Sequence, residues 1–443
     1  MAWTISVCLP SGRAAELALE RSQTLKEVKV KAQEVLGQKF LQLITEEGTF
    51  MDLRQNLDEA GLYHGASVQA CVMTPLLHCT RSSFGLQVGH RLVTWGAALL
   101  EDHDGWDPPL QENVKEVKCT GLAFAALRTD GSVVCWGHPS FGGTMSVEAL
   151  AAKAGDRRCT ALCATVGAFA ALLDDGSVIA WGSPQLGGVI GPDVAPLRDV
   201  VRLDATHGAF FATRAEGRTA VWGSWNPEKE VLEKLRDFRA VSGTQYARAV
   251  VLADGSILTS GNQAFGGDSS AVREHLKDAQ ALQASDHAFA AVLGAERRVV
   301  TWGHQRYGGD SSHVQLELFD VVQLEATRKA FAARRGDGRV ICWGDPNHGG
   351  QPDEELQEQL CDVSHVVAGG RGFAALKTDG QVLFWGSRTY SGVALGARRV
   401  TTLVGAFGGA WAAVLEGGGL VAWGDPKSGG EVPPEVLELV ESL

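Results

Sequence analysis

Cys159 and Cys163, four residues apart, are the residues in this 443-residue chain that most directly invite metal chemistry. Thiolates at such spacing bind zinc when a second pair of Cys or His residues follows. No such pair follows, so the sequence indicates buried strand thiols and predicts no metal site. The nine cysteines have irregular spacings, and reduced thiols in an intracellular compartment, cytoplasmic or nuclear, are expected.

The phrase Gly-Gly-Asp-Ser-Ser occurs twice, at 266–270 and at 308–312. It invites comparison with phosphate-binding and calcium-binding loops. However, it lacks the Lys of a P-loop and the series of carboxylates of a calcium loop. The serines are predicted instead to N-cap short helical turns over 269–276 and 311–318, and no cofactor is predicted.

Three histidines, His207, His287 and His304, have no Ser, Cys or Asp partner at the spacing of a hydrolase motif. The sequence does not decide whether they meet in space around a central channel. The sequence therefore predicts no catalytic residues, and the chain is expected not to be an enzyme.

The elements that position these residues are repeated along the chain. A short alternating run, a tight turn, a second run and Trp-Gly recur nine times at spacings of 38 to 45 residues, as in FAARRGDGRVICWG from Phe331. Ser260 replaces the Trp in the fifth unit. The other units have Trp95, Trp136, Trp181, Trp222, Trp302, Trp343, Trp385 and Trp423. Asp-Gly, as at 337–338, supplies the positive φ that a two-residue hairpin turn needs, so each unit is predicted to be a β-hairpin.

A third apolar run precedes most hairpins, for instance at 321–326 and 363–368. Each unit is therefore predicted to be a three-stranded sheet, and sheets this small must stack to bury their faces. The large Trp beside small Ala and Gly residues suits the space between neighbouring sheets. The predicted fold is mainly β, a β-propeller of nine short blades. The segment 436–440 is expected to lend a strand to the first blade near 76–79.

This repeat, with glycine pairs such as Gly349-Gly350 after Trp-Gly, resembles that of the regulator of chromosome condensation family. The short unit is similar to the bacterial beta-lactamase inhibitor protein of the same superfamily. The resemblance covers about residues 74–443 and implies a ring-shaped binding surface. Members of that family use it for nucleotide exchange on a small GTPase, enzyme inhibition, light sensing or ubiquitin-ligase scaffolding, so the fold does not select an activity. Family rings usually have seven blades, whereas nine units are counted here.

Residues 1–73 carry no copy of the repeat and are predicted to form a separate domain, with residues 74–443 as the propeller. A helix is expected from Thr24, with Glu27 completing a capping box, to Gly37. Strands are expected at 3–7, 15–19, 40–45, 49–53 and 67–72.

This small α+β roll resembles ubiquitin, most closely at 24–31, 43–45 and 66–70. It runs into the propeller without the terminal Gly-Gly that conjugation uses, so it is not expected to be conjugated. The resemblance implies partner binding through a sheet face on which Ile44 holds the matching exposed position.

The net charge is −12, from 40 Lys and Arg against 52 Asp and Glu, and no basic tail is present. Neutralising phosphates requires positive charge, so nucleic-acid binding is not expected. No apolar run reaches the roughly 18 residues of a membrane span, so no membrane association is expected either.

Function is expected where the chain departs from its repeat. Trp106 and Trp225 lie in predicted loops, and Arg248 replaces the Phe of the fifth unit. Together with Ile44, these residues are the candidate partner contacts. The chain is predicted to be a non-enzymatic scaffold whose propeller binds a protein partner and whose roll recruits ubiquitin-pathway components. The alternative is a regulator of an enzyme, either a guanine-nucleotide exchange factor for a small GTPase or an inhibitor.

Overall fold

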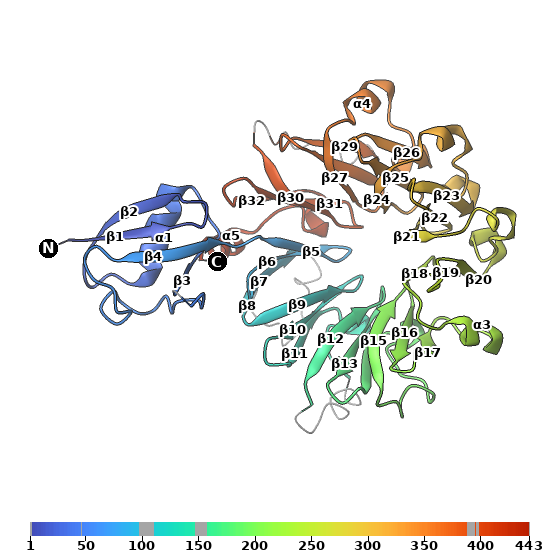
Figure 1. Ribbon diagram of the computed structural model, residues 1–443, viewed down its shortest axis with the longest axis horizontal. Helices are drawn as coiled ribbons and strands as arrows, with labels where there is room; N and C mark the ends of the chain where they lie inside the picture. The colour runs from blue at the N-terminus through green and yellow to red at the C-terminus, as the bar shows by residue number, and fades with distance from the viewer. Residues whose placement is uncertain are drawn as a thin grey trace.

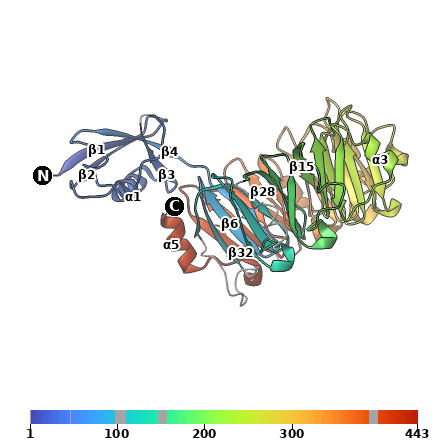
Figure 2. The same cartoon turned by 90° about the horizontal axis from the view of Figure 1, so that it is seen from below.

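The computed structural model describes residues 2–45, 47–96, 110–146, 157–387, 395 and 398–442. A small N-terminal roll is followed by nine further sheets, which succeed one another around a common centre so that the last lies beside the first (Figure 1). Seen after a 90° turn, the roll projects from the side of the array at which the chain also ends (Figure 2).

The roll is a four-stranded sheet with one helix, and its strand order is β2-β1-β4-β3. Its elements are β1 (Trp3–Cys8), β2 (Ala14–Leu19), α1 (Leu25–Leu36), β3 (Leu41–Ile44) and β4 (Ser67–Val72). Strand β1 pairs antiparallel with β2 and parallel with β4. The predicted capping box is confirmed, because Thr24 Oγ1 accepts from Glu27 N and the Glu27 carboxylate accepts from Thr24 N. The helix ends at Gly37 in the left-handed conformation, also as predicted.

The strand predicted at 49–53 is wrong, since only a single bridge joins Phe50 to Ile44. Beyond that bridge the carbonyl groups of Leu53 and Gln55 accept hydrogen bonds from the first two N–H groups of α1, at 3.0 and 2.8 Å. The first N–H groups of a helix have no partner within it. This segment therefore provides hydrogen-bond acceptors for the first N–H groups of α1 and does not extend the sheet.

All nine predicted units form antiparallel sheets, numbered 1 to 9 here, and sheet 1 has a fourth strand. Sheets 1 to 4 are β5 (Leu76–Cys79), β6 (Ser83–Val88), β7 (Arg91–Gly96) and β8 (Leu110–Gln111); β9 (Val114–Cys119), β10 (Ala123–Arg128) and β11 (Val133–Gly137); β12 (Cys159–Ala164), β13 (Ala168–Leu173) and β14 (Val178–Gly182); β15 (Val200–Ala205), β16 (Ala209–Arg214) and β17 (Thr219–Gly223). Sheets 5 to 7 are β18 (Ala240–Gly243), β19 (Ala247–Val251) and β20 (Ile257–Gly261); β21 (Ala279–Ala284), β22 (Ala288–Leu293) and β23 (Arg298–Gly303); β24 (Val321–Ala326), β25 (Ala330–Arg335) and β26 (Val340–Gly344). Sheets 8 and 9 are β27 (Val363–Ala368), β28 (Gly372–Lys377) and β29 (Val382–Gly386); β30 (Val400–Gly405), β31 (Ala410–Leu415) and β32 (Leu420–Gly424).

Between sheets, the Phe and Trp of one unit pack on the alanines of the unit before it. In sheet 7, Phe331 and Trp343 face each other across β25 and β26 with stacked rings 5.3 Å apart, and both are buried in one cluster with Ala290 of sheet 6. Trp343 Nε1–H also donates to the Gly308 carbonyl oxygen at 3.0 Å. The same indole-to-glycine bond is made by Trp95, Trp181, Trp222, Trp302 and Trp385. The predicted packing of these tryptophans between sheets is confirmed.

The Asp-Gly turns have three loop residues instead of the predicted two. In sheet 2, Arg128 N donates to Ser132 O at 2.8 Å and Gly131 N donates to Arg128 O at 3.0 Å. Only Gly131 has a positive φ, 83°, and Asp130 Oδ1 accepts from Ser132 N, which is typical of a type I turn followed by a glycine bulge. Gly131 O also accepts from Cys159 N of sheet 3 at 2.9 Å, so the turn joins neighbouring sheets.

The chain ends in a helix, and the strand predicted at 436–440 is wrong. Helix α5 (Pro434–Ser442) begins at a proline, whose fixed φ suits the first helical position. Val436 and Val440, four residues apart, are buried in one cluster with Phe84 of sheet 1. The segment therefore does pack on sheet 1, but as a helix. Strand β30 of sheet 9 also contacts β5 of sheet 1.

Candidate functional site

The loops between the first and second strands of the sheets form one end of the array, called the loop face here. Backbone hydrogen bonds run from loop to loop along it. Their donors are Arg81, Gly121, Val166, Asp286, Arg328 and Gly408, and their acceptors are the carbonyl oxygens of Gly121, Val166, His207, Arg328, Gly370 and Arg81, respectively. The bond from Gly408 of sheet 9 to Arg81 of sheet 1 measures 2.7 Å. This belt fixes the backbone from which the loop side chains project.

Side chains that depart from the repeat gather in one sector of the loop face. One loop position holds glycine in sheets 3 and 4 but a large side chain in the next four sheets; the residues are Gly167, Gly208, Tyr246, His287, Lys329 and Arg371. Phe265 and Tyr307, which precede glycine pairs, lie between them. The resulting loop-face arc comprises Tyr246, Phe265, His287, Tyr307 and Lys329.

The loop-face arc is a continuous row of rings. Ring centroids are 5.2 Å apart for Tyr246 and Phe265, 4.3 Å for Phe265 and His287, and 4.3 Å for His287 and Tyr307. Lys329 Nζ lies 5.1 Å from the Tyr307 ring centre, as a cation–π contact requires. Tyr246 is 46% exposed and the other four residues are half-buried. Partly exposed aromatic rings on a fixed backbone are typical of protein-binding surfaces.

The histidine in the arc is neutral near pH 7. Burial lowers the pKa of His287, because it disfavours the charged ring, and the Asp286 carboxylate opposes that effect. His304 stands edge-on to Tyr307, 5.0 Å away, rather than beside a nucleophile. Of the three histidines considered for a triad, two therefore join an aromatic surface.

The pKa of four histidines is lowered mainly by burial, and this predicts a pH effect on stability. They are His78, His207, His287 and His365, each below the ordinary value of 6.5. The folded chain then binds fewer protons than the unfolded chain as the pH falls through that value. The free energy of unfolding is therefore expected to fall between about pH 7.5 and about pH 5.5. Burial raises the pKa of Glu325, and this shift favours a rise in the free energy of unfolding on acidification. It is one group against the four histidines.

Urea unfolding followed by tryptophan fluorescence at the two pH values checks this expectation. The midpoint should lie at lower urea concentration at the lower pH, and replacing the four histidines by Gln should reduce the difference. A midpoint that rises on acidification contradicts the expectation.

A hollow lies next to the arc on the loop face. Arg81, Arg328 and Arg371, from sheets 1, 7 and 8, line it together with Phe407 and Asp425 of sheet 9, and its volume is about 550 Å³. Within the described part of the chain, none of the three guanidinium groups forms an ion pair. We call it the arginine hollow.

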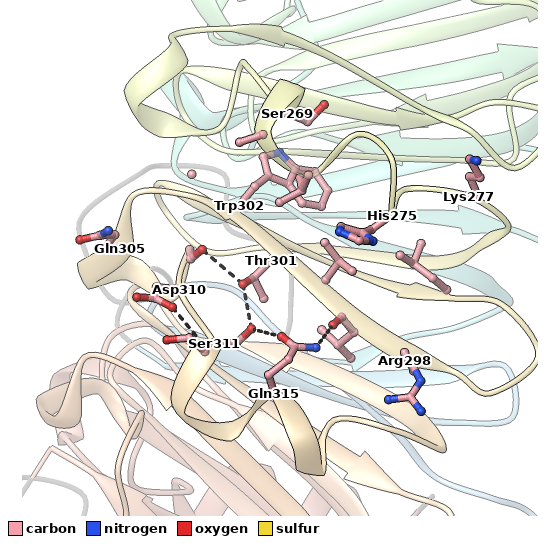
Figure 3. Close-up of a pocket in the computed structure, with 18 of the residues that line it drawn as sticks. Ser269, His275, Lys277, Arg298, Thr301, Trp302, Gln305, Asp310, Ser311 and Gln315 are labelled. Carbon is pink, nitrogen blue, oxygen red and sulfur yellow. Dashed lines mark hydrogen bonds between the residues drawn. The ribbon is translucent and has the colours of Figure 1, made fainter.

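A larger groove, of about 1160 Å³, lies on the outer rim beside β23 (Figure 3). Its side chains bond to one another and to nearby backbone: Ser311 Oγ donates to Gln315 Oε1 at 2.9 Å, Gln315 Nε2 donates to the Val299 carbonyl oxygen at 2.8 Å, and Thr301 Oγ1 donates to the Gly309 carbonyl oxygen at 3.2 Å. These bonds hold the 3₁₀ helix η7 (Ser312–Glu317) against the open edge of β23. Helix η7 therefore takes the place of a fourth strand at this edge, and the bonds within the groove have a structural role.

Ser269 and Ser311 occupy the predicted N-cap positions, but their side chains make no cap hydrogen bond. Ser269 and Ser311 hydroxyls bond to the Thr259 and Thr301 side chains, at 3.0 Å each. The preceding aspartate bonds to the turn instead, as Asp310 Oδ1 accepts from Ser312 N at 2.9 Å. A carboxylate one residue earlier reaches the turn while the serine faces the sheet edge.

The cysteines considered for metal binding lie in β12. The Cys159 thiol is buried and contacts Ala161 O, and burial raises the pKa of Cys163 to about 12. The Cys163 thiol is therefore protonated, and the prediction that both cysteines lie in a strand is confirmed. In the ranges that the structure describes, no three His, Cys, Asp or Glu side chains gather into a metal-binding group.

Trp225 is not the exposed partner contact that was predicted. Its exposure is only 9%, and its ring lies 5.6 Å from that of Phe211 in a cluster with Leu235 and Phe238. In the fourth unit the helix α3 (Lys229–Lys234) stands in place of the glycine pair, and Trp225 fills the space beneath it.

Arg248 is likewise internal, which corrects its prediction as a surface contact. It faces Ser260 across β19 and β20, where other sheets have Phe and Trp, and is 3% exposed. Arg248 Nη2 donates to Ser224 Oγ of the preceding unit at 2.7 Å, and Nη1 to Gln245 O at 3.4 Å. At this interface an arginine-to-serine bond replaces the indole-to-glycine bond. The sequence signal for this altered interface is that the fourth unit lacks the glycine pair and the fifth unit lacks the Trp.

The last two predicted contacts lie elsewhere. Ile44 is half-buried on β3, bridged to Phe50, which is 51% exposed and 6.5 Å from the His90 ring of sheet 1. Trp106 lies outside the described residues. Across the described residues, no helix combines the length and the apolar character needed to cross a bilayer.

No family model and no curated protein matches this chain. Solved structures do. The ectodomain of the Physcomitrella patens receptor kinase CR4 is 17% identical, covering 60% of this chain and 74% of its own, with a TM-score of 0.37. Prp20p of Saccharomyces cerevisiae is 15% identical, covering 77% and 90%, with a TM-score of 0.40. Human WBSCR16 is 14% identical, covering 75% and 85%, with a TM-score of 0.35.

Proposed function

We propose that this chain is a non-enzymatic protein-interaction scaffold whose nine sheets close into one propeller that presents the loop-face arc to a protein partner. The observation that carries the proposal is the asymmetry of one loop position. It is glycine in sheets 3 and 4 but Tyr246, His287 and Lys329 in sheets 5 to 7. In sheets 3 and 4 packing explains the glycine, because a Cβ at Gly167 or Gly208 would lie 2.6 or 2.8 Å from Leu186. In sheets 5 to 7 the same position instead carries partly exposed side chains, which are typical of a protein-binding surface.

Three contacts support the proposed closure of the array into a rigid platform. The Gly408-to-Arg81 backbone bond, the Trp95-to-Gly429 bond of 3.1 Å and the contact of β30 with β5 all join sheet 9 to sheet 1. A closed ring leaves no free end from which the sheets can unstack. Its loops then bind with little loss of conformational freedom.

A non-enzymatic role is proposed because several described side chains that could act in catalysis are committed to other contacts. The Ser269 and Ser311 hydroxyls bond to threonines, and burial raises the pKa of Cys342 to about 12. His287 lies between aromatic rings. These positions give stable packing rather than an activated nucleophile.

The experiment is affinity capture with the full chain. The triple variant Tyr246→Ala, His287→Ala, Lys329→Ala is compared with wild type and with Leu316→Ala, which removes a rim side chain that is 90% exposed. Partners captured by wild type should be retained by L316A and reduced about tenfold or more in the arc variant. Equal capture by all three proteins would show that the loop-face arc is not the binding surface.

The roll is proposed to recruit ubiquitin-pathway components through Ile44 and Phe50, which lie side by side at the end of β3. Full-length wild type and the double variant Ile44→Ala, Phe50→Ala are immunoprecipitated and probed for ubiquitin receptors and proteasome subunits. Recovery that does not depend on the two residues, or no recovery at all, would exclude this part of the proposal.

Regulation of an enzyme remains the alternative function for the same face. A nucleotide-release assay across small GTPases distinguishes exchange activity from scaffolding. Acceleration that the arc variant loses would identify an exchange factor.

A further inference from the structure

The arginine hollow is held in place by the backbone belt. Arg328 N donates to Gly370 O at 3.4 Å, while Arg328 O accepts from Asp286 N at 2.9 Å. The backbone N–H of Arg81 donates to Gly121 O at 2.8 Å, and its carbonyl oxygen accepts from Gly408 N at 2.7 Å. Both arginines therefore project from backbone that is bonded on two sides. Such positioning reduces the conformational entropy lost on binding a ligand.

Within the described residues, the hollow keeps an excess of positive charge. Asp425 is its only acidic lining residue, and its carboxylate already accepts from Lys427 N at 3.1 Å and from Ser428 Oγ at 2.8 Å. It thereby caps the 3₁₀ helix η10 (Pro426–Ser428). Three arginines thus line one hollow in a chain whose net charge is −12.

We infer that the arginine hollow binds an acidic segment of the protein partner, through carboxylates paired with Arg81, Arg328 and Arg371. The inference rests on the proposed function and names the chemistry of the partner. Guanidinium groups pair with carboxylates in a planar, two-bond geometry that is stronger than a neutral hydrogen bond. Arg328 is next in sequence to Lys329 of the loop-face arc, so the hollow and the arc are close enough for one partner to contact both.

The surroundings favour a peptide over a nucleic acid. Phe407 lines the hollow and is 47% exposed, which provides an apolar contact for a side chain next to the carboxylates. A polyanion gains affinity from many phosphate contacts along an extended basic surface. Here the hollow is small and the rest of the chain is acidic, so a short segment that combines Asp or Glu with an apolar residue fits better.

A phage-displayed library of random dodecapeptides, panned on the full chain, tests the inference. The hollow variant is Arg81→Gln, Arg328→Gln, Arg371→Gln. The matched control, Arg54→Gln, Arg218→Gln, Arg298→Gln, makes the same change of charge at exposed arginines elsewhere. Affinities of labelled selected peptides are measured by fluorescence anisotropy at low and high salt. Thermal unfolding identifies any variant that has lost its fold, in which case Arg371→Gln alone replaces the triple variant.

Peptides rich in Asp and Glu are expected on wild type, with affinity about tenfold or more weaker for the hollow variant, unchanged for the matched control and weaker at high salt. Selected peptides without acidic excess, or bound equally by the hollow variant, overturn the inference. So does a single-stranded oligonucleotide or pyrophosphate that displaces the peptides and binds more tightly. If only the arc variant loses binding, the hollow is not the peptide site and the inference is wrong, while the proposed function stands. Peptides insensitive to both variants, or no enriched peptides, refute both.

Discussion

Replacing Trp343 by Ala is expected to lower the free energy of unfolding by about 3–5 kcal/mol. The side chain is fully buried, stacks on Phe331 and donates its Nε1–H to Gly308 O at 3.0 Å. Alanine would leave a cavity between sheets 6 and 7 and a carbonyl group without its partner. Because each sheet buries its face only against its neighbours, the loss falls on the coupling between sheets.

Urea unfolding of Trp343→Ala beside wild type measures this effect. Trp343→Phe should cost less, since it keeps most of the buried ring but loses the hydrogen bond. Leu316→Ala, at a side chain that is 90% exposed, should stay within about 0.5 kcal/mol of wild type. A loss below about 1 kcal/mol for Trp343→Ala would show that the indole does not couple the sheets.

Gly308→Ala is expected to destabilise the same interface by about 2–5 kcal/mol, from two sources. Its φ is 89°, a conformation that costs an alanine roughly 1–2 kcal/mol. An added Cβ would also lie 2.5 Å from Phe331 Cδ2, and overpacking of a core costs typically about 1–3 kcal/mol.

Gly191→Ala is the matched control, because no atom lies within 4 Å of the added Cβ. It should leave the urea midpoint unchanged or slightly raised. Gly308→Ala combined with Trp343→Ala should cost less than the sum of the two changes, because both act on one contact. Strict additivity would mean that glycine and tryptophan stabilise the fold independently.

The repeated parts of the fold were predictable because local signals agree with the packing. The turn glycines, alternating apolar runs and Trp-Gly each demand the same hairpin. The capping box of Thr24 and Glu27 likewise specifies where α1 begins. The strands predicted at 49–53 and 436–440 are wrong for different reasons. The first segment accepts hydrogen bonds from the start of α1, a tertiary contact that a local pattern does not specify. In the second, Val436 and Val440 are four residues apart, a spacing that also places them on one face of a helix.

The candidate site was less predictable, because a departure from the repeat has two possible causes. At Trp225 and Arg248 the cause is internal, since each residue refills an interface that has lost its glycine pair or its tryptophan. At Tyr246, His287 and Lys329 the side chains instead point to the loop face. Comparing one loop position across all sheets would have found the arc, whereas the prediction considered His287 only as part of a triad.

Site-specific photo-cross-linking tests most directly whether the loop face is the binding surface. Benzoylphenylalanine is placed in the full chain at Tyr246 on the loop face, at Leu316 on the rim, or at Tyr63 on the roll, all exposed positions. The propeller partner should cross-link from Tyr246 and not from Leu316, and cross-links from Tyr63 should report a different, ubiquitin-pathway protein. A partner that cross-links from Leu316 and never from Tyr246 would contradict the assignment of function to the loop face.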